Sequence, residues 1–204
     1  MKRGVLSTLT LSCLAAMSFG QVTGLVSIPT ADVIGHREVE LGYSIAGMDH
    51  SISKEYGHSA YILAGAFDRF EIAGSTDFLG GQGWGFKFVP FRSSDDKIAI
   101  GLGAQNINGG QSDFFAMGRY NCGNANFHLG WTRDSDHRGL LGVDYSCDRW
   151  TFGADYSSNA DGATWIGAWY DLGEGFAVNI SFGRPTTRSD GDQHSMMLIY
   201  GTRF

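Results

Sequence analysis

The residues of this sequence that could do chemistry are charged or titratable side chains set singly among apolar and small residues. Seven of them fall in stretches where polar and apolar residues alternate: Glu40, Glu71, Lys87, Arg119, His128, Asp144 and Asp155. Alternation with a period of two is typical of β-strands, so these side chains should share the polar face of a sheet. On a closed face they would pair with one another, because an unpaired buried charge is costly. On a face that lines water they would bias which solutes pass.

His128 and Asp144 come closest to an enzyme's acid–base pair, because their predicted strands follow one another in the chain. A hydrolase also needs a nucleophile and an orienting group within reach. The sequence has no G-x-S-x-G motif, no H-E-x-x-H motif and no Cys/His cluster with metal-ligand spacing. We therefore expect no catalytic residue, no metal, no cofactor and no enzymatic activity, with an outer-membrane hydrolase as an alternative.

Strands are the elements that must position these side chains. The chain is 43% hydrophobic and only 18% charged, so it is apolar enough to fold. Its formal net charge of -6 argues against a nucleic-acid partner. The alternation predicts strands at Glu38–Gly47, His58–Phe67, Arg69–Asp77, Gly83–Pro90, Lys97–Gln105, Asp113–Asn121, Ala125–Thr132, Gly139–Ser146, Arg149–Ser157, Ala163–Tyr170, Gly175–Phe182 and Ser195–Phe204.

Two architectures fit such a pattern: a soluble secreted β-sandwich that binds carbohydrate, and a transmembrane barrel whose apolar face meets lipid. The predicted connections alternate between tight turns and longer loops, which is typical of outer-membrane barrels. The three prolines lie at strand ends or in loops, as a closed ladder requires. We therefore predict an all-β, antiparallel, up-and-down transmembrane β-barrel of about twelve strands, within a range of about ten to fourteen.

The N-terminus carries an export signal. Lys2 and Arg3 precede an apolar run that ends in the small residues around Gly20, which is the pattern of a cleaved secretory signal peptide over residues 1–20. Residues 21–37 are expected at or inside the periplasmic mouth of the barrel, or as an extra strand, and residues 38–204 as the barrel. The predicted location is the bacterial outer membrane.

Two features near strand ends complete the prediction. Leu198, Tyr200 and the terminal Phe204 share one face of the last predicted strand and resemble the C-terminal signal read by the barrel-assembly machinery. Cys122 and Cys147 are the cysteines that remain after the leader, and they lie at tight turns on one side of the barrel. Export to an oxidising compartment makes them a candidate disulfide.

Three short pieces of the sequence carry a family resemblance: Gly24-Leu25, Ile28–Asp32 and Leu41–Ser44. These pieces resemble the opening of YjbH-like outer-membrane proteins linked to exopolysaccharide production. The resemblance implies an outer-membrane barrel associated with polysaccharide secretion. Together with the strand pattern it favours a small passive pore or a polysaccharide-secretion factor, with a non-conducting structural or adhesive barrel as the alternative. The expected partners are outer-membrane lipid, the barrel-assembly machinery, and polysaccharide or small solutes.

Overall fold

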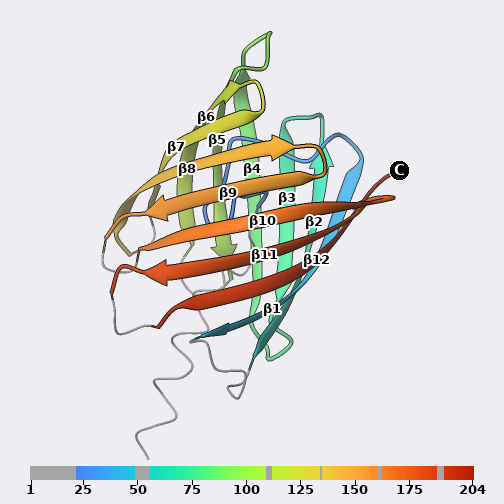
Figure 1. Cartoon of the computed structure of the whole chain (residues 1–204). Coiled ribbons are helices and arrows are strands. Elements are labelled where there is room, and N and C mark those ends of the chain that lie inside the picture. Colours follow the sequence, from blue (N-terminus) through green and yellow to red (C-terminus); the bar gives the residue numbers. More distant parts are fainter. Residues whose placement is uncertain (1–21, 49–55, 109–111, 134, 160–161, 188–190) are drawn as a thin grey trace, which may run out of the picture.

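Twelve antiparallel strands form a closed barrel in the computed structural model, which describes residues 22–48, 56–108, 112–133, 135–159, 162–187 and 191–204 (Figure 1). The predicted signal peptide lies outside the described residues. The strands are β1 (Glu38–Met48), β2 (Gly57–Ala66), β3 (Phe70–Thr76), β4 (Gln82–Arg92), β5 (Ile98–Ile107), β6 (Asp113–Cys122), β7 (Ala125–Arg133), β8 (His137–Cys147), β9 (Trp150–Ser157), β10 (Ala163–Gly173), β11 (Phe176–Pro185) and β12 (Gln193–Arg203). The predicted all-β barrel is confirmed.

The barrel closes where its first and last strands meet. β1 and β12 pair in one unbroken register from Glu38 opposite Arg203 to Met48 opposite Gln193. Pro90 departs from the prediction, because it lies inside β4 rather than at its end. The β4–β5 register shifts between Phe88 and Phe91, and a bulge of this kind accommodates a residue that cannot donate to the ladder.

The connections give the barrel two different ends. Five connections of two to five residues lie at what we call the short-turn end: 67–69, 93–97, 123–124, 148–149 and 174–175. Connections of three to eight residues lie at the long-loop end: 49–56, 77–81, 108–112, 134–136, 158–162 and 186–192. The chain enters β1 and leaves β12 at the short-turn end, where the Phe204 amide donates to the Arg37 carbonyl at 3.1 Å.

The outer face of the barrel is apolar and layered. Exposed aliphatic side chains occupy its middle: Leu41, Ile62, Ile72, Ile100, Leu129, Leu141, Ile166, Ile180 and Leu198. Exposed aromatic side chains lie toward the two ends: Phe91, Tyr120, Tyr145, Trp150 and Phe176 at the short-turn end, and Trp84, Phe114, Trp131 and Tyr156 at the long-loop end. An apolar band between two aromatic girdles is the outer surface of membrane barrels. Within the described part of the chain, no helix is long and apolar enough to cross a membrane.

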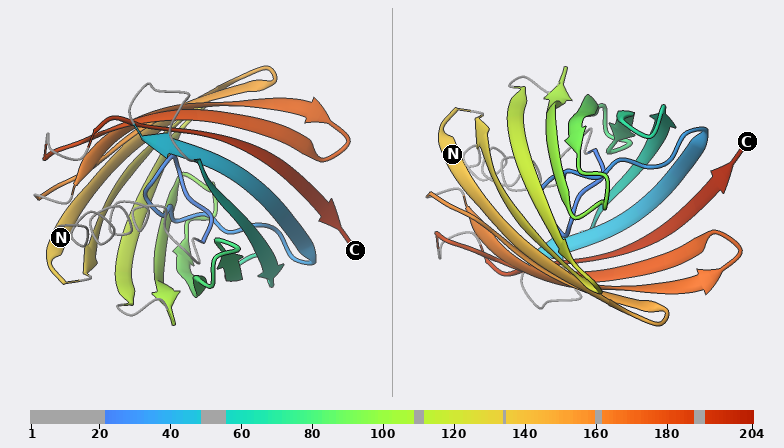
Figure 2. Two further views of the ribbon diagram at one scale, coloured as in Figure 1. Left: turned by 90° about the horizontal axis from the view of Figure 1, so that it is seen from below. Right: turned by 90° about the horizontal axis from the view of Figure 1, so that it is seen from above.

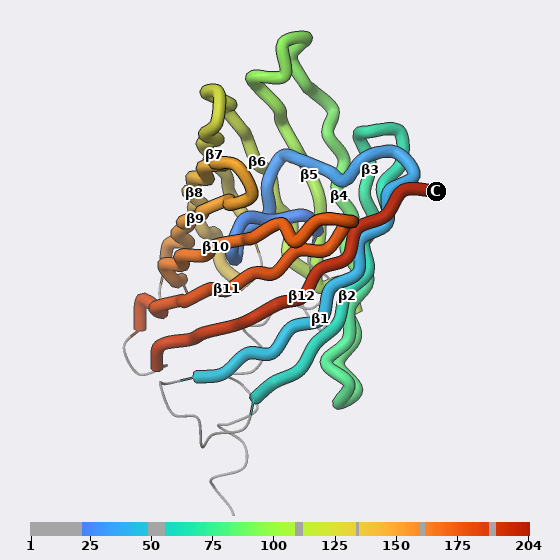
Figure 3. Tube along the Cα trace, turned by 45° about the vertical axis from the view of Figure 1, so that its right-hand side comes forward, coloured from blue at the N-terminus to red at the C-terminus, as the bar shows by residue number. Residues whose placement is uncertain are grey.

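Residues 22–34 lie inside the ring of strands, as both views of Figure 2 and the tube in Figure 3 show. Residues 22–34 double back on themselves, with Gly24 bridged to Pro29 and the Leu25 amide donating to the Ile28 carbonyl at 2.9 Å. We call this segment the lumenal hairpin. Its buried Val22, Ile28 and Ala31 join inward side chains of the wall in one apolar cluster. The core of the protein is therefore the contact between hairpin and barrel.

Candidate functional site: the filled lumen

The first polar contact between hairpin and wall is centred on Glu71 of β3 and Lys87 of β4. These two residues pair across the strands, are fully buried, and hold their charged atoms 3.8 Å apart. The Glu71 carboxylate accepts the Thr23 amide at 2.5 Å, the Thr23 hydroxyl, and the Ile34 amide at 3.0 Å. The Lys87 ammonium donates to the Thr23 carbonyl at 2.7 Å. One buried ion pair therefore holds both ends of the hairpin.

The second contact is a carboxylate held in a cradle of backbone amides. Asp155 points inward from β9 and is 3% exposed. It accepts the amides of Val26 at 2.9 Å, Ser27 at 2.7 Å and Ile28 at 3.4 Å, and the Ser27 hydroxyl at 2.7 Å. Successive amides at a turn make a natural anion site. Here the anion belongs to the wall and the amides belong to the tip of the hairpin.

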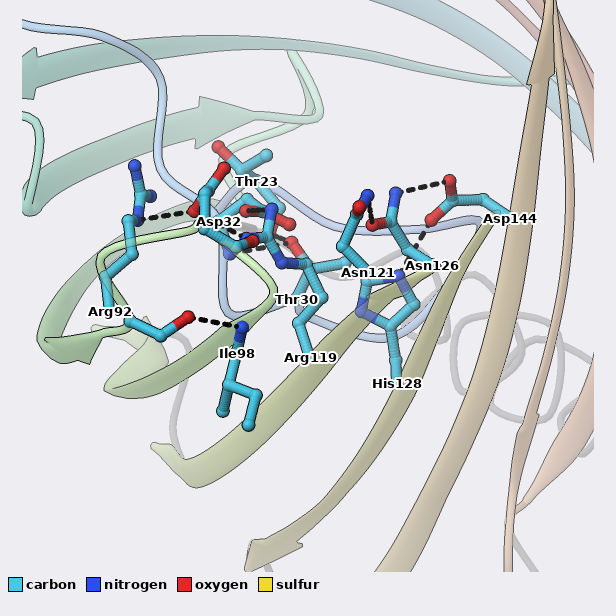
Figure 4. A network of polar contacts seen from close by, with 12 residues as sticks. Thr23, Thr30, Asp32, Arg92, Ile98, Arg119, Asn121, Asn126, His128 and Asp144 are labelled. Atoms are coloured by element: carbon cyan, nitrogen blue, oxygen red, sulfur yellow. Dashed lines mark hydrogen bonds and ion pairs between the residues drawn. The ribbon is translucent and has the colours of Figure 1, made fainter. Parts of the chain in front are cut away.

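The third contact is made by Arg119 of β6, near the short-turn end (Figure 4). Its guanidinium donates to the Asp32 carboxylate of the hairpin at 2.6 Å. It also donates to the carboxylate and the carbonyl of Asp96, both at 2.7 Å. Asp96 belongs to the turn between β4 and β5. Arg119 therefore joins the hairpin to a turn at the mouth and is neutralised on both sides.

Inward glycines of the wall leave the space in which the hairpin packs. A Cβ at Gly142 or Gly153 would come within 3.0 Å of the Leu25 side chain, and one at Gly101 would lie 3.1 Å from the Ala31 Cα. At Gly65 it would lie 2.3 Å from the Gly35 carbonyl oxygen and 2.5 Å from that of Ile34. In a barrel predicted from sequence alone, inward glycines indicate room for a solute. In the structure much of that room is taken by the lumenal hairpin.

His128 and Asp144 do come together, in a hydrogen-bond network on β6, β7 and β8. The His128 ring nitrogen Nε2 lies 2.7 Å from the Asp144 carboxylate, which also accepts from Asn126 at 2.9 Å (Figure 4). Asn121 donates to Asn126 at 2.8 Å and extends the chain. The neighbours of the pair in this network are amides, which are not nucleophiles. Among the described residues, no group of three or more His, Cys, Asp or Glu could hold a metal ion.

Glu40 of β1 faces a different part of the lumen. It accepts the hydroxyl of Tyr61 at 2.8 Å, and the Tyr61 ring lies across Gly42. The residue paired with Glu40 on β12 is Gly201, where a Cβ would meet no heavy atom within 4 Å. The seven charged residues thus fall into three hairpin contacts, one histidine–carboxylate pair and one carboxylate beside open space.

The cysteines contradict the prediction made from their turns. Cys122 and Cys147 are free, exposed thiols. Cys122 ends β6 and Cys147 ends β8, so β7 lies between them. Two strand spacings amount to roughly 10 Å, beyond the limit of about 7 Å between the Cα atoms of a disulfide. The predicted disulfide is therefore wrong for this structure.

The residues predicted as an assembly signal lie on the outer face of β12. Leu198 and Phe204 are exposed, and the Tyr200 ring lies 4.7 Å from that of Phe176 on β11. That a barrel-assembly machinery recognises these residues stays a prediction.

The partners that sequence reasoning missed are Thr23, the amides of residues 26–28, Asp32 and Asp96. Their signal was slight, because the alternation of Val22, Gly24, Val26 and Ile28 and the family resemblance marked the segment but not its contacts.

Comparison with known proteins bears on the fold. No protein-family model and no curated protein matches the chain. Among solved structures, a KdgM porin in complex with disordered oligogalacturonate superposes with a TM-score of 0.59 at 12% identity, over 79% of this chain and 98% of that one. A NanC porin gives 0.58 at 11% identity, over 81% of this chain and 99% of that one. The chain shares the barrel fold of these porins.

Proposed function

We propose that the protein is an integral outer-membrane β-barrel that acts as a small passive pore, narrowed from within by the lumenal hairpin. The observation that carries the proposal is a closed barrel with an apolar, girdled exterior around polar and charged side chains. A soluble sandwich would bury its bulky face, whereas here the bulky face is exposed. The shared fold with two porins supports the same reading.

Two observations bear on the class of solute. The YjbH-like pieces of the sequence, which imply polysaccharide secretion, lie largely within the hairpin, and one solved neighbour carries oligogalacturonate. We therefore include polysaccharide-derived or other small hydrophilic solutes among the candidates. The YjbH-like family and its partners remain part of this proposal.

A non-conducting structural barrel is the second candidate, and the hairpin itself favours it. Thr23, Asp32 and the amides of residues 26–28 bind three separate places on the wall, and the apolar cluster fills the space between. A lumen held in this way could be closed throughout.

Planar-bilayer recording of the refolded protein separates the two candidates. The pore predicts discrete single-channel steps from the wild type, and larger steps from Asp155→Ala, which removes the carboxylate that holds the amides of the hairpin tip. Silence from both proteins would overturn the pore and favour the structural barrel. Membrane fractionation tests the location independently, because recovery of the protein in the soluble fraction would overturn both candidates.

A further inference from the structure

The indole of Trp165 lies flat against the inner wall of the barrel near the long-loop end. Trp165 is the third residue of β10 and pairs with Asp155 of β9 on one side and with Gly183 of β11 on the other. A Cβ added at Gly183 would lie 2.4, 2.5 and 2.6 Å from the Cε2, Cδ2 and Cζ2 atoms of the indole. Nearly equal distances to three adjacent ring atoms put that position over the face of the ring and not at its edge. One face of the indole therefore covers Gly183, and the other faces the lumen.

Trp165 lies where the filled middle of the lumen gives way to the long-loop end. Ser181, one inward position closer to the middle on β11, is 5% exposed, whereas Trp165 is half-buried. The ring leans over Gly183, away from Asp155 and from the hairpin tip that Asp155 holds. Because one face of the ring is against the wall, the exposed part of the indole is on the lumenal side.

A free amide lies beside this indole. Gln193 of β12 pairs with Gly183 on the side opposite to Trp165, so the two side chains flank one glycine. Gln193 is half-buried, and neither its amide nor the Trp165 indole N–H has a hydrogen-bond partner in the part of the chain that the structure describes. A side-chain amide offers two donor hydrogens and an acceptor oxygen. An aromatic face flanked by such groups suits a ligand that has an apolar face and polar edges.

The charges of the lumen favour a neutral ligand over an acidic one. Inward cations of the wall are engaged by carboxylates: Lys87 by Glu71, Arg119 by Asp32 and Asp96, and Arg138 by Asp113. The whole chain carries a formal net charge of -6. Cations that are already paired attract an acidic sugar weakly, and a neutral sugar needs no counter-charge.

We propose that Trp165 and Gln193 form a binding site for a neutral saccharide at the long-loop end of the lumen. The C–H groups on one face of a pyranose ring pack on the indole, and the sugar hydroxyls exchange hydrogen bonds with the Gln193 amide. The role of the site in solute passage rests on the proposed function, and the site adds the class of solute and the residues that bind it. That class differs from oligogalacturonate, the acidic saccharide of the KdgM porin complex.

Isothermal titration calorimetry of the refolded protein in detergent micelles tests the site. The probes are three neutral saccharides, maltohexaose, cellohexaose and xylohexaose, with hexagalacturonate as the acidic comparison. At least one neutral probe should bind more tightly than hexagalacturonate. Trp165→Ala should weaken that binding about tenfold, Trp165→Phe should weaken it less, and Gln193→Ala should weaken it about fivefold. Trp84→Ala is the matched control, because Trp84 is the third residue of β4 at the same end but is exposed on the outer face, and it should bind like the wild type.

Three results overturn the inference: no binding of any neutral probe, binding of hexagalacturonate as tight as that of the neutral probes, or wild-type affinity in Trp165→Ala. Where Trp165→Ala fails to fold, wild-type affinity in both Trp165→Phe and Gln193→Ala overturns it instead. Calorimetry does not depend on conduction, so the two proposals fail separately. Silent bilayers overturn the pore, and a conducting barrel that binds no neutral saccharide overturns the site.

Discussion

The wall covered by the lumenal hairpin and the seam between β1 and β12 use the same residue types in different surroundings. On the covered wall, charges and glycines bind the lumenal hairpin: Glu71, Asp155 and Arg119 hold its backbone and side chain, and Gly65 and Gly101 admit its main chain closely. At the seam, an added Cβ at Gly201 would meet no heavy atom within 4 Å, and Glu40 accepts the hydroxyl of Tyr61. The difference shows that the role of an inward charge or glycine depends on what lies against it in the lumen.

Loss of the buried ion pair should have the largest effect on stability. Glu71→Gln leaves Lys87 buried without its counter-charge, and breaking one side of such a pair costs about 3 to 5 kcal/mol. Urea unfolding in detergent micelles would measure the change in the free energy of unfolding. The double variant Glu71→Gln/Lys87→Met should recover part of the loss. An equal or greater loss in the double variant would show that the ion pair is not the cause.

A pair of glycine substitutions compares the covered wall and the seam directly. Gly65→Ala forces a Cβ against the carbonyl oxygens of Ile34 and Gly35, and overpacking of this kind costs about 1 to 3 kcal/mol. Gly201→Ala is the same chemical change where no atom lies within 4 Å, and it should cost far less. Thermal unfolding of the two variants side by side gives the comparison. Equal losses would contradict the difference between the covered wall and the seam.

The cysteines should give the smallest effect. Cys122→Ser and Cys147→Ser remove exposed, unbonded thiols and should each change stability by less than about 0.5 kcal/mol. Maleimide labelling of the folded, unreduced protein should modify both thiols. A protein that takes up label only after reduction would reinstate the disulfide.

Much of the barrel follows from local sequence, because the alternation that marks each strand is local. The predicted strand Asp113–Asn121 differs from β6 by one residue at its C-terminal end, and Phe204 closes the last predicted strand one residue beyond β12. Pro90 was placed at a strand end because the bulge that admits it depends on how β4 pairs with β5.

The lumen could be predicted only in part. The strand pattern separates inward Glu71, Arg119 and Asp155 from the outward aromatic residues, but their partners are distant in the chain. Asp155 binds amides 127 to 129 residues away, and Arg119 binds Asp32 at a separation of 87. Backbone amides carry no sequence signature, so the cradle for Asp155 has no motif. The disulfide was predicted from shared turns, and the intervening β7 rules it out.

The most direct test of a lumen narrowed by the hairpin is single-channel conductance of three proteins in one bilayer system. Asp155→Ala removes the acceptor of four hydrogen bonds at the hairpin tip, so its conductance should exceed that of the wild type. Asp144→Asn alters an inward carboxylate that contacts His128 and Asn126 instead, and it should conduct like the wild type. Equal conductance in all three proteins would contradict a hairpin that narrows the pore.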